Sequence, residues 1–364
     1  MTFAELKELL TKPVGAPREG EPKSRRPAPA LGDVVGVELG AGDVRGCPAV
    51  RLVHRKGVWS VRALGFVSPP KDSLPDSWKG LNRQPTRSLP ADFAAPSAAL
   101  AVASSSQVVR QTTVESLSDG GAKQTALGVP LSHDGLRFRL EPLGEASSVL
   151  ESGLPEYQVL WLSRLFPEGK RPTACSVQTS VAAMLAALSE QPDFKADGGT
   201  AAALFVTHSS VYFVGFREGL PVLFREFPGL GGLRTIRETL KTGLGLGEER
   251  ILDEMLDDTL VDPTPILGPV VNPILRQLEL SLDYLVNRLG ISVSRVFLMG
   301  LTSGAQHWSR MAESMLNVRL AAPDLFAGVE LSAKFDRGVE PLLKRSHMFL
   351  AAFGAARAAM EVEK

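Results

Sequence analysis

The spacing of hydrophobic positions predicts one local arrangement twice, in copies that begin about 165 residues apart. In the first copy, residues 34–67, valine-rich segments alternate with glycine turns: VVGVEL, AVRLVHR and VWSVRALGFV. In the second copy, residues 199–227, three apolar segments are separated by turns at His208–Ser210 and Arg217–Gly219. Each copy is typical of three strands joined by two hairpins, which indicates a duplicated fold.

Other segments have the period of helices. We expect amphipathic helices over PEYQVLWLSRLFP (155–167) and ACSVQTSVAAMLAALSEQ (174–191). A further helix is predicted at 273–289, with Asn272 as its N-cap, Pro273 in its first position and Gly290 at its end. The apolar segment RSHMFLAAFGAARAAM near the end of the chain predicts a core helix. A helix on a membrane surface is the alternative, although cations are sparse there.

The N-terminal region, residues 1–31, differs in composition from the rest. Thr2 and Glu5 form a candidate capping box for a short helix, on which Phe3, Leu6, Leu9 and Leu10 share one face. This segment is either a frayed end or a docking helix for a partner. Residues 12–30 are rich in proline and charge, which predicts a disordered linker and a folded body that starts near Leu31.

Composition narrows the classes of function. The chain has 364 residues, and its 40 Lys and Arg balance its 40 Asp and Glu, so no overall basic field favours nucleic acid or anionic lipid. Its two cysteines, Cys47 and Cys175, give no disulfide framework or metal motif, which favours a reducing cytoplasm. No apolar run reaches the roughly 18 residues of a membrane span. GxSxG, HExxH and CxxC motifs do not occur.

The order of several degenerate segments resembles the PilM family of actin-like proteins. These proteins serve type IV pilus and type II secretion machinery and are relatives of the cell-division protein FtsA. The segments are VVGVELG, RKGVWSVRALGFV, REFPGLGGLRTIRETL, LRQLELSLDYL, RVFLMGLTSG and FLAAFGAARAAM. The resemblance spans roughly residues 33–360. It implies an α/β fold of two ribonuclease-H-like domains around a central nucleotide cleft, with an inserted small subdomain.

The resemblance also implies domain boundaries. Domain I covers residues 32–195 and contains the insert at about 97–165, and domain II covers 196–364 with a small lobe at about 228–289. In the cleft, Glu38 stands where the family has an aspartate, and Thr207-His208-Ser209 stands for Asp-hydrophobic-Gly. Gly300-Leu301 replaces a Gly-Gly pair. Because phosphoryl transfer depends on placed charges, these departures predict a vestigial cleft without catalytic or metal-binding residues.

The residues expected to line this vestigial cleft are Gly36, Glu38, Gly40, Gly42, Thr207, Ser209, Gly231, Gly232, Gly300, Thr302, Ser303 and Gly304. No cofactor is expected, while weak binding of ATP with magnesium stays open.

By resemblance, the chain is a non-catalytic cytoplasmic scaffold, peripheral to the inner membrane. Its expected partner is the cytoplasmic N-terminal tail of a PilN-like bitopic membrane protein, and a secretion ATPase is a further candidate. The tail would dock between domain I and the insert, and Ala103, Ser105, Val108, Val109 and Gln111 are candidates for part of the groove wall. The alternative is that this segment is ordinary sheet interior. The alternatives are an ATP-dependent enzyme of the actin, Hsp70 and sugar-kinase superfamily and an FtsA-like polymer on a membrane.

Overall fold

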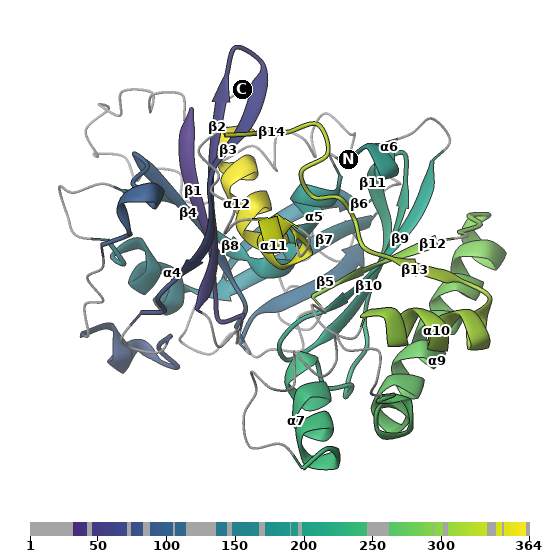
Figure 1. Cartoon of the computed structure of the whole chain (residues 1–364). Coiled ribbons are helices and arrows are strands. Elements are labelled where there is room, and N and C mark those ends of the chain that lie inside the picture. Colours follow the sequence, from purple (N-terminus) through teal and green to yellow (C-terminus); the bar gives the residue numbers. More distant parts are fainter. Residues whose placement is uncertain are drawn as a thin grey trace.

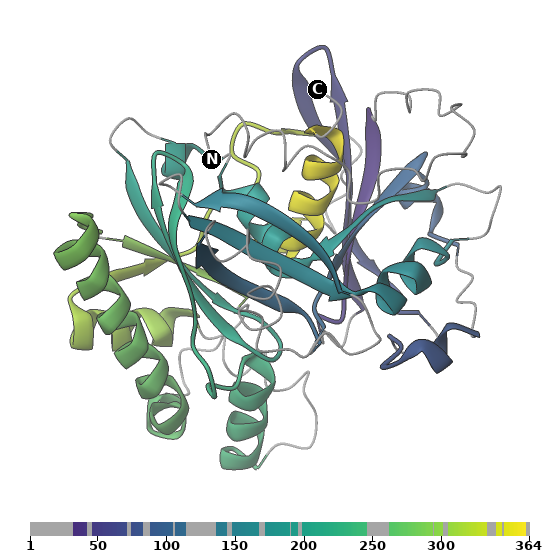
Figure 2. The same cartoon turned by 180° about the vertical axis from the view of Figure 1, so that it is seen from behind.

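Two larger β-sheets and one small sheet form the framework of the molecule in the computed structural model (Figures 1 and 2). The structure describes residues 32–41, 46–70, 74–82, 88–104, 106–113, 136–143, 148–166, 172–189, 191–195, 199–245, 262–293, 295–300, 305–332, 340–343 and 346–361. The N-terminal region 1–31 and the acidic stretch 246–261 lie outside these residues.

The first sheet has six strands in the order β14-β3-β2-β1-β4-β8. Their bounds are β1 Asp33–Leu39, β2 Cys47–Arg55, β3 Val58–Val67, β4 Ser97–Val102, β8 Thr173–Thr179 and β14 Glu330–Leu331. β1 to β3 form an antiparallel meander, and β4 joins β1 in parallel. Residues of β1 and β4 are almost all buried, because helices or loops cover both faces of the sheet.

The second sheet repeats this arrangement with five strands in the order β11-β10-β9-β12-β13. Their bounds are β9 Thr200–Val206, β10 Val211–Arg217, β11 Leu220–Glu226, β12 Arg295–Met299 and β13 Arg319–Ala321. β9 to β11 are an antiparallel meander, and β12 joins β9 in parallel. The duplication predicted from the sequence is therefore confirmed.

The third sheet is an insert between β4 and β8. It has the order β5-β7-β6, with β5 Val108–Thr113, β6 Leu136–Leu143 and β7 Ser148–Pro155. The insert starts later than the expected residue 97, because β4 belongs to the first sheet, where it pairs with β1 from Val34↔Ser97 to Leu39↔Val102.

Helices pack on the faces of the sheets. Their bounds are α4 Glu156–Ser163, α5 Ser180–Leu188, α6 Pro192–Lys195, α7 Leu233–Gly243, α9 Thr264–Leu289, α10 Ala305–Leu316, α11 Glu340–Leu343 and α12 Leu350–Glu361; short 3₁₀ helices are η1 Trp78–Asn82, η2 Ala91–Phe93 and η4 Ser346–Phe349. Figure 1 shows α12 (yellow) beside α5 and the first sheet. This helix is buried almost throughout, as predicted for a core helix. It returns to domain I, so the expected division at residue 195 does not hold for the end of the chain.

Two helix predictions were wrong in extent. The segment 174–191 is a strand followed by a helix, because β8 pairs in parallel with β4 and Thr179 then caps α5 by accepting a hydrogen bond from the Ala182 N–H (3.2 Å). The helix predicted at 273–289 begins nine residues earlier, at Thr264, and contains Pro269 and Pro273 within it. Gly290 ends it in the left-handed conformation, as predicted.

Candidate functional site

The first candidate hairpin follows β1. Gly36 lies in the middle of β1, where a Cβ atom would stand 1.8 Å from the carbonyl oxygen of Ala352 on α12. Gly40 has φ +79°, and a Cβ atom there would stand 2.3 Å from the carbonyl oxygen of Ala103. Both glycines are thus required by contacts within the protein. Glu38 is 5% exposed and aligns with Ala101 of β4. Gly42 lies outside the described residues.

The second candidate hairpin joins β9 to β10 and is held by its own side chain. The Thr207 hydroxyl donates to the Ser210 carbonyl oxygen (2.9 Å) and accepts from the Ser210 N–H (3.2 Å). The Thr207 N–H also donates to the Ser210 carbonyl (2.9 Å). Because the hydroxyl has a donor and an acceptor role inside the turn, Thr207 serves to close the hairpin.

The N-terminus of α7 packs directly on this hairpin. The Leu233 N–H donates to the Thr207 carbonyl oxygen (2.8 Å), and the Arg234 N–H donates to the His208 carbonyl oxygen (3.0 Å). Free N–H groups at a helix N-terminus are the groups that bind phosphate. Here the hairpin itself occupies two of them. Gly232 permits this contact, since a Cβ atom there would stand 2.2 Å from the Thr207 carbonyl oxygen.

Several predicted cleft residues do come together around the end of β9. A Cβ atom on Gly300 would stand 2.0 Å from the carbonyl oxygen of Val206, and one on Gly232 would stand 2.8 Å from the Ser209 nitrogen. Gly231 packs against Thr235 in the first turn of α7. Thr302, Ser303 and Gly304 lie outside the described residues. Among the residues that the structure describes, no group of three or more His, Cys, Asp or Glu is arranged to hold a metal ion.

A polar cluster beside the second hairpin was not foreseen from the sequence. Glu226 aligns with Tyr212 across β11 and β10. Burial raises the pKa of the Glu226 carboxyl, and a hydrogen bond from Ser210 offsets part of this rise. Burial likewise raises the pKa of Tyr212, whose hydroxyl accepts a hydrogen bond from Gln107 Nε2 (3.3 Å). Only tertiary pairing brings Glu226 next to this hairpin, so local sequence carried no signal for it.

The predicted partner wall faces the second domain. Ala103 follows β4, and its N–H donates to the Leu39 carbonyl oxygen (2.9 Å). Val108, Val109 and Gln111 lie on β5, where Val109 is buried and Gln111 Oε1 accepts from the Phe224 N–H of β11 (3.0 Å). Ser105 lies outside the described residues. The described residues of this wall contact other parts of the chain, and they do not line the groove found next to the insert.

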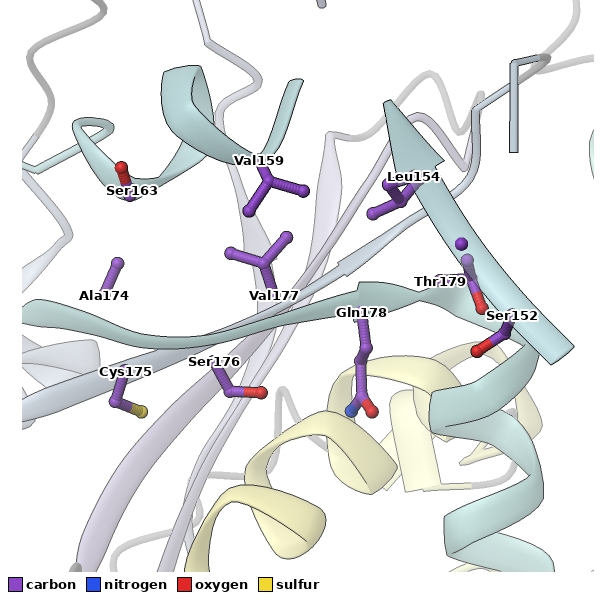
Figure 3. A pocket seen from close by; sticks show the side chains of 11 residues that line it. Ser152, Leu154, Val159, Ser163, Ala174, Cys175, Ser176, Val177, Gln178 and Thr179 are labelled. Carbon is purple, nitrogen blue, oxygen red and sulfur yellow. The ribbon is translucent and has the colours of Figure 1, made fainter. Parts of the chain in front are cut away.

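That groove lies along the edge of the first sheet, and we call it the sheet-edge groove. It has a volume of about 350 Å³. The described residues that line it come from β7, α4 and β8: Ser152, Gly153, Leu154, Val159, Ser163, Ala174, Cys175, Ser176, Val177, Gln178 and Thr179. In Figure 3, Val159 of α4 and Val177 of β8 point toward one another. The groove therefore runs between domain I and the insert, the region that the sequence analysis had expected.

The groove's chemistry suits an extended chain. β8 is the last strand of its sheet in the part of the chain that the structure describes, so one side of its backbone has no strand partner there. The described lining side chains are small, apolar or uncharged polar, and none of them carries a charge. The sequence pattern did not predict this strand, because its small residues continue into the pattern of α5. The strand signal was the β-branched residues Thr173, Val177 and Thr179.

Comparison with known proteins agrees with this architecture. No protein-family model matches the chain, and no curated protein matches it. Among solved structures, the PilM-PilN type IV pilus biogenesis complex is similar over 91% of this chain and 99% of the other, with a TM-score of 0.65 and 18% identity. A Bacteroides thetaiotaomicron protein with an actin-like ATPase fold covers 86% of this chain and 96% of its own (TM-score 0.43, 10% identity). The archaeal actin homologue Ta0583 is similar over 90% of this chain and 99% of its own, with a TM-score of 0.39 and 11% identity.

The duplicated sheets and the parallel fourth strands, together with the similarity to the PilM-PilN structure, define an actin-like fold, which confirms the predicted fold class. Within this class, the fold is that of the chain in the PilM-PilN complex, and the predicted resemblance to PilM is confirmed at the level of fold.

Proposed function

We propose that this protein is a non-catalytic cytoplasmic scaffold of a type IV pilus or type II secretion-like assembly at the inner membrane. In this proposal it binds the cytoplasmic N-terminal tail of a PilN-like bitopic membrane protein. The observation that carries the proposal is the sheet-edge groove, in a fold shared with a protein solved as a PilM-PilN complex. None of the described helices is long and apolar enough to cross a membrane. Attachment of this protein to the membrane through a membrane-spanning partner is compatible with this finding.

The mode of binding follows from the strand at the groove. An extended peptide can add to an unpaired sheet edge, so that main-chain hydrogen bonds supply affinity and alternate side chains enter pockets. At β8, alternate side chains of the peptide would meet the apolar side chains of Val159 and Val177, which point toward one another. Because the described lining is uncharged, the segment that enters the groove should be uncharged too. A buried charge without a partner would lower affinity.

The state of the two hairpins supports a non-catalytic role. Thr207 provides no carboxylate for a metal ion, and its hydroxyl closes the turn. Two N–H groups at the α7 N-terminus donate to backbone carbonyls and are not available to a phosphate. A site that has lost these donors should stabilise a phosphoryl-transfer transition state poorly.

The test is peptide binding to the whole chain. The probe is a fluorescein-labelled peptide of the cytoplasmic N-terminal residues of the PilN-like protein from the same genome, followed by anisotropy. Ser163→Arg places a large cation at the groove, and we expect it to weaken binding at least about tenfold, or 1.4 kcal/mol. Ser163 is a suitable site because its side chain is exposed and its hydroxyl donates to the Leu160 carbonyl within its own helix (2.8 Å).

The matched control is Ser314→Arg on α10. Ser314 makes the same kind of bond, from its hydroxyl to the Met311 carbonyl three residues earlier (2.9 Å), and it does not line the groove. This variant should bind the peptide as the wild type does. The proposal fails if the wild-type chain does not bind the peptide, or if the two arginine variants bind it equally well.

A second candidate function is ATP binding, which Glu38 and Glu226 favour as carboxylates close to the two hairpins. It is tested by thermal unfolding with millimolar Mg-ATP. A ligand at a hundred times its dissociation constant adds about 2.7 kcal/mol of stability. We expect no shift. A clear shift that Glu38→Ala abolishes would favour the ATP-binding function instead.

A further inference from the structure

The side chains that line the sheet-edge groove differ in size along its length. Helix α4 forms one of its walls and strand β8 another. In Figure 3, Val159 of α4 and Val177 of β8 point toward one another, so a branched side chain enters the groove from each of these walls. We call these two valines the narrow subsite.

One turn further along α4, both walls carry small side chains. Ser163 and Ala174 line this part of the groove, and we call them the wide subsite. Ala174 points toward α4 in Figure 3, whereas the Ser163 hydroxyl points away from β8. That hydroxyl donates to the Leu160 carbonyl oxygen of its own helix (2.8 Å). Because neither residue extends a bulky group across the groove, the wide subsite has room for a larger side chain than the narrow subsite.

A β-bulge in β8 places the two subsites on the same side of the strand. The pairing with β4 shifts register between Ala98 and Ala99, so that Cys175 is an extra residue of β8. The Cys175 thiol donates to the Ala98 carbonyl oxygen at this bulge (3.2 Å). Successive side chains of a regular strand point to opposite faces. Ala174 and Val177, three positions apart, therefore share a side because the bulge inserts one residue between them.

The spacing of the two subsites fits one extended chain. Val159 and Ser163 are four positions apart on α4, so they lie about 6 Å apart along the helix axis. Side chains on one face of a strand repeat at every second residue, or about every 6.6 Å. A peptide that adds to the edge of β8 can therefore present one side chain to each subsite, with a single residue between them that faces the other way.

We infer that the partner peptide carries a bulky apolar side chain in the wide subsite and, two residues away, a small side chain in the narrow subsite. This inference rests on the proposed function and adds the sequence feature by which the groove selects its peptide. Val159, Ala174 and Val177 pack against a core cluster that includes Trp161. A leucine, methionine or phenylalanine in the wide subsite would thus leave water for apolar surroundings, which is favourable in proportion to the area removed from water.

A peptide series tests this selection on the full chain. Each residue of the fluorescein-labelled N-terminal peptide of the PilN-like protein is replaced in turn by alanine, and binding is followed by anisotropy. We expect one bulky apolar residue, the anchor, whose replacement weakens binding to the wild-type chain at least about tenfold. Ala174→Val makes the wide subsite smaller. It should weaken binding of the unchanged peptide about tenfold, but that of the peptide with alanine at the anchor position less than about threefold.

The matched control is Ala321→Val on β13. Ala321 is also a half-buried strand residue that packs against a core cluster, and it does not line the groove. This variant should bind every peptide as the wild type does. Ser163→Val fills the wide subsite from the other wall and should give the same pattern as Ala174→Val, so the test does not depend on the folding of one variant.

The outcomes separate this inference from the proposed function. A wild-type chain that binds no peptide of the series would overturn the proposed function, and the inference with it. Binding without a bulky apolar anchor would overturn the inference alone. So would valine variants that weaken binding of the unchanged peptide and of the peptide with alanine at the anchor position by the same factor, or that weaken neither.

Discussion

At the scale of single residues, glycines that resemble a nucleotide site serve internal packing. Gly36 admits the backbone of α12 to the face of β1, and Gly232 admits the second hairpin to the start of α7. A sequence pattern cannot distinguish a glycine that faces a ligand from one that faces another part of the chain, because both need a missing Cβ. The sequence therefore predicted where these glycines would lie but not what they would contact.

The packing role of Gly36 is testable by stability. In Gly36→Ala, the new methyl group would overlap the Ala352 carbonyl oxygen at 1.8 Å, so α12 would have to move. We expect a loss of about 3 kcal/mol in the free energy of unfolding, measured by urea titration with circular dichroism. The control is Gly268→Ala in α9, where the nearest atom would be 3.7 Å away. It should change stability by less than about 1 kcal/mol. A neutral Gly36→Ala would contradict the packing role.

At the scale of elements, local signals predicted best where tertiary contacts agree with them. The two meanders and α12 follow their sequence patterns, and Gly290 ends α9 as expected. The sequence pattern predicted helix for β8 because its small residues continue into the alanine-rich pattern of α5, whereas its pairing with β4 decides its conformation as a strand. The start of α9 at Thr264 was not predicted, because Pro273 is typical of the first position of a helix. In the structure, packing of Leu267 and Val271 maintains the helix through Pro269 and Pro273.

The inserted sheet contains an element-scale test of its own. Arg110 of β5 donates to Glu151 of β7 through Nε (3.1 Å) and Nη2 (3.0 Å), and Glu151 is 3% exposed. Arg110→Met should cost about 3 kcal/mol, because it leaves a buried carboxylate without its ion-pair partner. Replacing both residues by Met should cost clearly less than Arg110→Met alone. Urea unfolding of the two single variants and the double variant measures this. A double variant that loses the sum of the single losses would show that the two residues act independently.

At the scale of the whole molecule, the two domains are tied together by more than the chain that connects them. The C-terminal helix α12 crosses back to the first sheet and joins a core cluster that also includes Phe205 and Val214 of the second sheet. The inserted sheet adds a second tie, where β5 lies against β11. In this molecule, contacts at two separate places therefore join the two domains. The sequence could not predict the second tie, since it joins residues more than 100 positions apart.

Gln111 is the residue on which this second tie is best tested. Its Oε1 accepts the Phe224 N–H on the side of β11 that faces β5, so Gln111→Leu leaves that N–H without its acceptor. An unsatisfied buried donor costs about 1–3 kcal/mol, and its hydrogen exchange should accelerate accordingly. Tyr212→Phe removes the hydroxyl that interacts with Gln107 (3.3 Å) and with Ser210, neither of which bonds the Phe224 amide, and it should have a smaller effect on that amide. Hydrogen exchange resolved at β11 measures both variants. Unchanged protection of Phe224 in Gln111→Leu would mean that this hydrogen bond does not hold β5 against β11.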